Sequence, residues 1–310
     1  MGDNLPPALL TTSLVNTIQI GSLYALMALG ITLTFSVMKL PNFAHAEYVT
    51  AGAYAALIVS LSGVLNPLVI MIAAFVVGAL TALISHLAVF KPLEGRDVSF
   101  YTLILASFAV GLIIRYILFT MADYFNLFDL RIAIPLRVLF REGYLILSNL
   151  FAWVVPTSLV LVIVLTLLLN RSPLGREMRA LANNINLARV IGIPVERVKN
   201  YTWLLVGGLA GVAGALWGLQ TAVHPLMGWG AIISVFAAAI LGGLSSFSGT
   251  ILGAYVVAFS ENTVILFLNV NYGVDLAYKP AIPFIIIIVV LLFRPQGLTK
   301  LIRRAGDLGR

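Results

Sequence analysis

The sequence predicts an all-α, polytopic integral membrane protein, a helical bundle of eight or nine transmembrane helices. Of the 310 residues, 61% are hydrophobic and only 10% are charged, whereas an ordinary soluble domain carries about 25% charged residues. The mean hydropathy is +1.04. Apolar runs of about 20 residues, the length that crosses a bilayer, recur along the chain. We therefore expect most of the chain to lie in lipid.

The apolar runs and the residues that interrupt them define nine candidate spans. The first run is long enough to be tilted or kinked, and the seventh is short enough to be re-entrant, so both eight and nine crossings fit. We expect residues 1–310 to form a single transmembrane domain. The predicted spans are residues 9–37, 44–62, 66–90, 100–121, 150–170, 200–222, 230–245, 249–269 and 281–293.

Basic residues predict the orientation, because cytoplasmic loops are enriched in Lys and Arg. With nine alternating spans, one face receives most of the basic loop residues and the basic carboxyl-terminal tail. We expect that face to be cytoplasmic, with the carboxyl terminus inside the cell and the amino terminus outside. The basic residues of these cytoplasmic loops account for the net charge of +7, so the charge does not indicate nucleic-acid binding. The basic residues on this face are Lys39, Lys91, Arg96, Arg171, Arg176, Arg179, Arg189, Arg197, Lys199, Arg294, Lys300, Arg303, Arg304 and Arg310.

The composition argues against most kinds of catalysis. The sequence has no cysteine, which removes disulfides, thiolate nucleophiles and sulfur-ligated metals. It has three scattered histidines and neither an HExxH nor a GxSxG motif, so an intramembrane serine protease is only a formal alternative. No glycine–lysine pair occurs, so a phosphate-binding P-loop is missing. We expect no catalytic residue, metal or cofactor in this chain.

Two long polar stretches interrupt the apolar runs. The predicted external one, residues 122–149, mixes aromatic and charged residues with a proline. It fits either a structured lid or docking surface, or an interfacial helix or hairpin that rests on the lipid headgroups.

The predicted internal stretch contains a short amphipathic helix at about residues 172–192. Leu181, Ile185 and Ala188 recur there at helical spacing, and Gly192 and Pro194 then end the helix. A helix of this kind, held outside the membrane between two spans, either lies on anionic lipid or docks on a partner protein.

Four stretches resemble the membrane subunits of ATP-binding-cassette importers, in particular the branched-chain amino acid permeases of the LivH type. "GREMRALANN" followed by "ARVIGIP" is similar to the cytoplasmic coupling helix of these permeases. "GSLYALMALGITLTFSVMKLPNFAHAEYVTAGAY" is similar to their amino-terminal signature, which usually reads about "NFAHGE". "VGGLAGVAGALWG" and "AYKPAIPFIIIIVVLLFRPQGL" are similar to two later spans, although Pro280 and Pro283 depart from the family pattern. The resemblance covers residues 21 to 298.

The resemblance implies a type II ABC importer-like permease that cannot power itself. The implied partners are a second permease (a LivM-like paralogue or a second copy), two ATP-binding subunits that carry ATP and Mg, and an extracytoplasmic solute-binding protein. Branched-chain amino acids are the implied solute, with other amino acids, urea and short amides as alternatives. The residues implied to couple the chain to the ATPase are Glu177, Arg179, Ala180, Asn183, Arg189 and Gly192.

Glycines predict where helices pack closely. Gly207, Gly211, Gly214 and Gly218 advance by four, three and four residues, which places them on one helical stripe. Gly249 and Gly253 repeat the small-xxx-small step in a later span, together forming a second expected packing seam.

The stretch "KLPNFAHAEY" predicts a break between the first two spans. Pro41 disfavours helix at the preceding residue, and Asn42 can cap a new helix. Glu47 then lies near the positive end of the helix dipole, on a different face from His45.

Ionisable groups inside a membrane are costly and are treated as functional by default. We interpret Arg115, His86 and His224 as structural, with Arg115 paired to an acid. A rival function is a stand-alone secondary transporter or channel in which His45, Glu47 and Glu261 form a proton or ion relay. The residues predicted to line or gate a translocation path are Asn42, His45, Glu47, Tyr54, Glu261 and Asn262.

Overall fold

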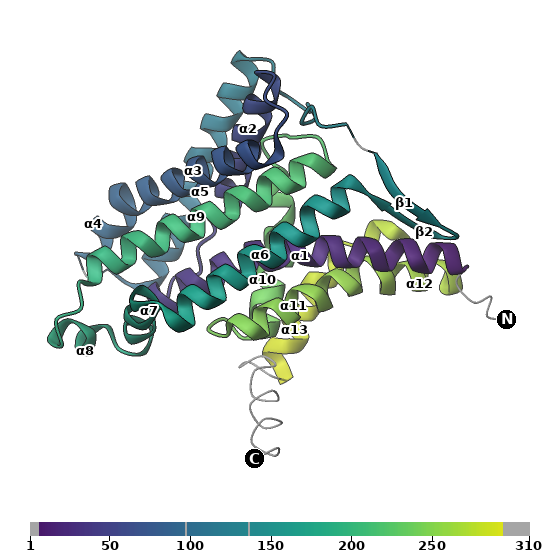
Figure 1. The fold of residues 1–310 in the computed structure, drawn as a ribbon. Helices are drawn as coiled ribbons and strands as arrows, with labels where there is room; N and C mark the ends of the chain where they lie inside the picture. The colour runs from purple at the N-terminus through teal and green to yellow at the C-terminus, as the bar shows by residue number, and fades with distance from the viewer. Residues whose placement is uncertain (1–5, 97, 136, 294–310) are drawn as a thin grey trace. The chain divides into compact units, whose positions relative to one another are not determined.

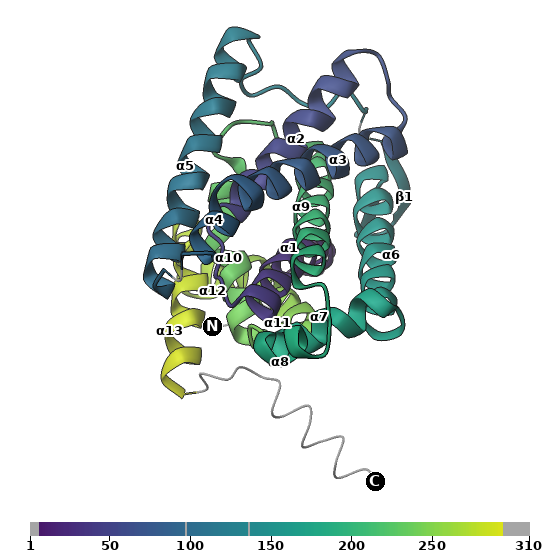
Figure 2. The same cartoon turned by 90° about the vertical axis from the view of Figure 1, so that its left-hand side faces the viewer.

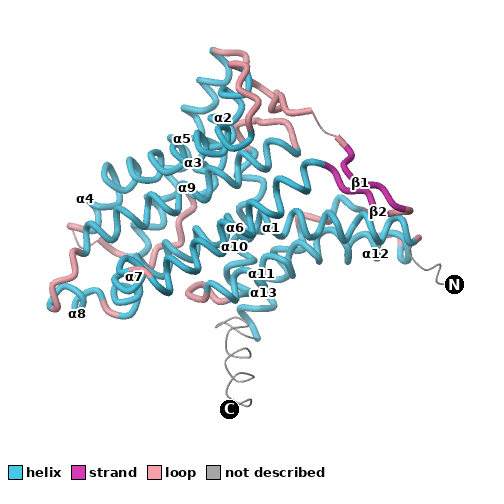
Figure 3. Tube along the Cα trace, in the orientation of Figure 1, coloured by secondary structure: helices cyan, strands magenta, loops and turns pink. Residues whose placement is uncertain are grey.

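The computed structural model describes residues 6–96, 98–135 and 137–293. Within these residues the chain consists of helices, one hairpin and the loops that join them (Figures 1 and 3). The basic tail from Arg294 to Arg310, including the end of the "LFRPQGL" stretch, lies outside the described residues.

Nine helical segments coincide with the nine predicted spans (Figure 1). Among the described residues, six of these segments are long and apolar enough to cross a membrane, α10 and α13 are shorter apolar helices, and the ninth segment, α2, has 17 residues. This confirms the predicted all-α membrane fold. The elements are α1 (Pro7–Met38), α2 (His45–Leu61), α3 (Pro67–Ser85), the π-helical turn η1 (His86–Phe90), α4 (Lys91–Glu94), α5 (Phe100–Tyr124), α6 (Asn149–Arg171), α7 (Pro173–Asn183), α8 (Ile185–Val190), α9 (Val195–Gln220), α10 (Met227–Gly242), α11 (Phe247–Phe259), the π-helical turn η2 (Ser260–Val264), α12 (Ile265–Tyr272), the 3₁₀ turn η3 (Leu276–Tyr278) and α13 (Ala281–Phe293).

The predicted external stretch, residues 122–149, contains a two-stranded antiparallel hairpin of β1 (Val138–Glu142) and β2 (Leu145–Ser148), drawn in magenta in Figure 3. Asn149, the first residue of α6, ties the base of the hairpin: its Oδ1 accepts from the backbone N–H of Arg137 at 3.0 Å, and its Nδ2 donates to the carbonyl of Pro135 at 2.9 Å. The structure shows a hairpin in this stretch, and its role, as a lid or docking surface or as a hairpin that rests on the headgroups, stays a prediction.

The contacts divide the chain into two compact units, which are described separately below. Unit 1 comprises Met1–Leu29, Pro135–Leu159 and Ile233–Arg310, and unit 2 comprises Gly30–Ile134 and Val160–Ile232.

Helices α2, α3 and α9 form the centre of unit 2, and Figures 1 and 2 show α3 running beside α9. The predicted glycine stripe of α9 lies in this contact. Gly207 and Gly211 pack against the backbone of α3, whereas Gly214 packs against the carbonyl of Val49 in α2, and Gly218 contacts Val223. Small residues allow backbones to approach this closely in lipid, where packing rather than hydrophobicity drives helix association.

The second glycine pair packs within unit 1. Gly249 of α11 contacts the backbone of Gly242 in α10, and Gly253, one turn later, contacts the carbonyl of Ala238. At both glycines the backbones of α10 and α11 therefore approach each other directly.

Candidate functional site: two buried carboxylates and a helical elbow

The predicted break between the first two spans is confirmed. Helix α1 ends at Met38, Lys39 adopts a left-handed conformation with φ of 54°, and α2 begins at His45. The predicted cap at Asn42 is wrong in detail, because Ala44 is the residue that precedes the helix and has no side chain to cap it. Asn42 instead forms a turn before the helix, in which its Oδ1 accepts from the N–H of Ala44 at 3.1 Å.

The non-helical stretch 39–44 runs alongside α5 inside the protein. Lys39 lines a cavity together with Leu103 of α5, whereas Ala44 packs against Gly111, two turns further along that helix. Leu103 and Gly111 are eight residues apart, which corresponds to a rise of about 12 Å along α5. Leu40 and Asn42 are fully buried, as irregular backbone at membrane depth must be, because lipid cannot satisfy its polar groups. Helix α2 therefore begins beside the middle of a membrane-spanning helix.

Glu47, in the first turn of α2, forms an ion pair with Arg115 of α5. The guanidinium donates to Oε1 of the carboxylate from Nε at 3.0 Å and from Nη2 at 2.6 Å. The side chain of Glu47 is completely buried, and that of Arg115 is 11% exposed. The guanidinium carbon also lies 4.3 Å from the ring centroid of Trp229, within the range of a cation–π contact. The acid predicted to pair with Arg115 is thus Glu47, itself a predicted path residue.

The other path residues of α2 lie apart from this pair. The imidazole of His45 packs against Gly30 of α1 and meets the ring of Tyr48 edge-on at 6.1 Å. Tyr54, two turns beyond Glu47, lines an apolar cavity of about 450 Å³ between α2, α3 and α5.

Glu261 anchors a second polar cluster, within unit 1. It lies in the π-helical turn η2 and is 3% exposed. Ser234 of α10 donates to its Oε1 at 2.5 Å, and the hydroxyl of Tyr24 of α1 donates to its Oε2 at 2.8 Å. The neighbouring Asn262 accepts from the ammonium of Lys279 at 3.0 Å. Sequence reasoning missed Tyr24 and Ser234, because hydroxyl residues in apolar runs give no signal of a partner.

The predicted coupling helix is two helices rather than one. Helix α7 ends at Asn183 and α8 begins at Ile185, because the side chain of Asn184 accepts from the backbone N–H groups of Asn186 and Leu187, both at 3.0 Å. These two bonds start a new helix in a new direction. We call residues 173–192, which contain α7 and α8, the elbow.

The elbow exposes most of the predicted coupling residues. Glu177 and Ala180 are half-buried, and Gly192 ends the elbow with a φ of 83°. Arg179, Asn183, Arg189 and Gly192 are exposed.

Three exposed apolar residues lie at the tip of the elbow, and the sequence did not indicate a role for them. Leu187 is 58% exposed, Val190 82% and Ile191 65%. Contiguous exposed apolar side chains rimmed by polar ones mark interaction sites. We call these three residues the elbow patch.

A polar cavity of about 540 Å³ adjoins the elbow. The ends of α1 and α4, the start of α5, both elbow helices and Lys199 of α9 line it. The coupling candidates Asn183 and Arg189 thus border the same cavity as Lys39, at the end of the first helix.

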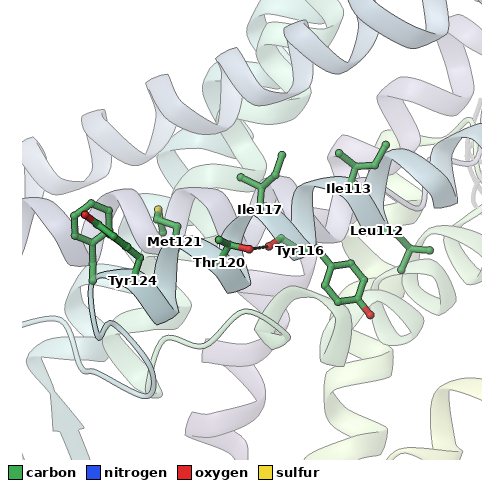
Figure 4. Close-up of a pocket in the computed structure, with 8 residues that line it drawn as sticks. Leu112, Ile113, Tyr116, Ile117, Thr120, Met121 and Tyr124 are labelled. Atoms are coloured by element: carbon green, nitrogen blue, oxygen red, sulfur yellow. Dashed lines mark hydrogen bonds between the residues drawn. The ribbon is translucent and has the colours of Figure 1, made fainter.

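A larger hollow of about 820 Å³ lies along α5, and its lining residues come from that helix and Phe125 alone (Figure 4). Figure 4 shows the apolar side chains of Leu112, Ile113, Ile117 and Met121 spread along the exposed helix, with the hydroxyl of Thr120 bonded to the carbonyl of Tyr116 at 2.9 Å. A face with one helix behind it and almost no polar lining suits lipid or another apolar helix, not a polar solute.

Comparisons with known proteins agree over nearly the whole chain. The family model described as "Branched-chain amino acid transport system / permease component" matches residues 13–291. The probable branched-chain amino acid transport permease protein LivH of Methanocaldococcus jannaschii is 35% identical over 90% of this chain and 89% of its own length. BraD of Pseudomonas aeruginosa, a high-affinity branched-chain amino acid transport system permease protein, is 31% identical over 92% of this chain and 94% of its own length.

Among solved structures, PsaBC from Streptococcus pneumoniae in complex with Fab aligns with 92% of this chain and 91% of its own chain, with a TM-score of 0.48 and 15% sequence identity. The family model and the relatives carry the assignment. The chain belongs to the LivH-type branched-chain amino acid permease family of ATP-binding-cassette importers.

Proposed function

We propose that this permease subunit carries branched-chain amino acids across the cell membrane, with ATP hydrolysed on two partner subunits. Family membership carries the proposal, since relatives of 35% and 31% identity are named for branched-chain amino acid transport. Other amino acids, urea and short amides are the competing solutes. A second permease subunit, either a LivM-like paralogue or a second copy, and an extracytoplasmic solute-binding protein complete the proposed assembly.

The elbow is the proposed docking site for an ATPase subunit. It combines exposed basic and amide side chains with the apolar patch of Leu187, Val190 and Ile191. Basic loop residues cluster on the same predicted side of the membrane, which supports a cytoplasmic elbow and a cytoplasmic carboxyl terminus. A helix between two long spans can transmit ATPase movements to both.

Family membership disfavours the rival function, a stand-alone ion- or proton-coupled transporter or channel. Copurification separates the two. The tagged chain, expressed with its neighbouring genes and purified in mild detergent, should bring an ATPase and a second permease with it. The assembled complex, reconstituted with its binding protein, should import L-leucine, L-isoleucine and L-valine only when ATP is supplied. Solute accumulation by vesicles that contain this chain alone would contradict the proposal.

A further inference from the structure

We propose that Glu47 and Arg115 bind the ammonium and carboxylate groups of a zwitterionic amino acid, next to an aromatic wall that takes its aliphatic side chain. The inference rests on the proposed function and deepens it, because it assigns the solute-binding groups within this chain.

The first observation is an unused acceptor on Glu47. Arginine normally meets a carboxylate through two parallel bonds to its two oxygens. Here both donating nitrogens of Arg115 bond to Oε1. The other oxygen, Oε2, is buried and has no hydrogen-bond partner in the part of the chain that the structure describes. Such an acceptor is costly unless something else donates to it.

The chemistry of the pair matches a zwitterion. An ammonium group carries three N–H donors and can donate to Oε2, and a guanidinium carries five donors, of which Nε and Nη2 account for only part. An incoming carboxylate can accept from the remainder. A neutral amine, a lone cation or a lone anion would satisfy only one half of the pair. Because a zwitterion has no net charge, its entry keeps the buried site electrically neutral.

The ion pair also explains how the two charges of the site can stay buried when no solute is bound. A single charge inside the membrane is costly, whereas Glu47 and Arg115 compensate each other. The solute then adds two opposite charges to a pair that is already neutral, so the net charge of the buried site stays zero. A permease needs binding of this balanced kind, because a solute that is held too tightly does not leave.

Aromatic rings beside the pair supply the apolar part of the site. Phe43 and Phe108 meet edge-on at 6.2 Å between centroids, and Phe108 meets Trp229 in the same way at 5.5 Å. The Arg115 guanidinium lies over the Trp229 ring. We call Phe43, Phe108 and Trp229 the aromatic wall. Phe108 is 41% exposed, so the wall is not completely covered by the rest of the described chain.

The site lies where the backbone is irregular. The stretch 39–44 ends beside it, and Ala44 and Glu47 both pack against Gly111 of α5. A solute bonded to both Glu47 and Arg115 would therefore bridge the start of α2 and α5. This links occupancy of the site to the contact between these two helices.

The test uses the full-length chain in lipid nanodiscs and L-leucine as the probe. Saturable leucine binding is measured with radiolabel and by the fluorescence of Trp229, taken as the difference from a Trp229→Phe variant. Two leucine analogues compete on the wild-type chain: 3-methylbutylamine has only the ammonium group, and 4-methylpentanoate has only the carboxylate. Each should compete at least about tenfold more weakly than leucine, because each leaves one member of the pair unmatched.

Conservative variants give the second arm. Glu47→Gln and Arg115→Lys should weaken leucine binding by about tenfold or more, while the control Glu142→Gln, on the exposed hairpin, leaves it unchanged. Thermal unfolding of each variant shows whether the chain is folded, and the analogue competition needs no variant at all.

Three outcomes would overturn the inference. They are no saturable leucine binding up to its solubility limit, an analogue that competes as well as leucine, and variants that lose thermal stability but keep leucine affinity, as a purely structural clamp would. If the complex imports leucine while the variants bind it normally, this inference fails and the proposed function stands. If the complex instead imports another zwitterion that competes at this site, the proposed solute fails and the inference stands.

Discussion

Lys199 of α9 donates to the carboxylate of Glu94, the last residue of α4. Both side chains are largely withdrawn from solvent, at 6% and 20% exposure. A second pair, Lys91 with Glu196 at 3.2 Å, joins the same two helices but is about half exposed on both sides. The start of α9, which follows the elbow, is thus fixed to α4 by one buried and one exposed ion pair.

These two pairs should differ sharply in their contribution to stability. Lys199→Met leaves the Glu94 carboxylate without its partner, and loss of one member of a buried pair costs about 3–5 kcal/mol. Partial exposure of Glu94 places the expected loss near the lower end of that range. Lys91→Met should cost only about 0–1 kcal/mol. Thermal unfolding in a single detergent, with both variants side by side, measures the difference. Equal losses would show that burial does not set the strength of these pairs.

The glycine stripe of α9 should tolerate no side chain at its centre. A β-carbon at Gly214 would collide with the carbonyl of Val49, so Gly214→Val should separate α2 from α9 and reduce the yield of folded protein. Gly230 of α10 is the matched control, because nothing lies within 4 Å of a β-carbon placed there. Gly230→Ala should keep or slightly raise stability, since alanine favours helix. Size-exclusion profiles and unfolding temperatures of both variants test this.

The elbow patch should be needed for association with the ATPase and not for folding. Leu187→Ser combined with Val190→Ser removes two exposed apolar side chains, so the thermal stability of the isolated chain should stay constant while the ATPase no longer copurifies. Arg197→Gln, an exposed change at the start of α9, serves as the control. Normal recovery of the ATPase with the double variant would place the docking surface elsewhere.

Glu261 should matter for transport as well as packing. A glutamine there offers one acceptor oxygen to the two hydroxyl donors, Ser234 and Tyr24, so one bond is lost at a cost of about 1–3 kcal/mol. We expect Glu261→Gln to lower the import rate per folded complex. Tyr24→Phe removes one bond and leaves the carboxylate in place, which separates the role of the charge from that of packing. Normal import by folded Glu261→Gln would remove this residue from the predicted path.

Composition and apolar periodicity were sufficient to predict the helical segments, because the length of an apolar run and its breakers are local properties of the sequence. The break before α2 was equally local, since Pro41 restricts its predecessor wherever it occurs. Asn184, by contrast, divides the elbow because its side chain accepts hydrogen bonds from two backbone N–H groups. The sequence alone does not show whether an asparagine in an amphipathic stretch caps a new helix or continues the old one.

Partners distant in the sequence were the harder problem. The sequence indicated that Arg115 needs an acid but not that the acid is Glu47, 68 residues earlier. It also could not show that Tyr24 reaches Glu261, because a single sequence carries no information on which helices are neighbours. The predicted path residues consequently divide between two clusters, one in each unit.

The stretch before α2 has a consequence for biogenesis. A helix of 17 residues with a carboxylate in its first turn is a poor substrate for insertion on its own, and the arginine that neutralises this carboxylate follows it only 68 residues later in the chain. Helix α2 should therefore wait at the translocon until α5 is synthesised. A chain truncated before residue 100 should leave α2 outside the lipid, whereas one that extends past Tyr124 should admit it.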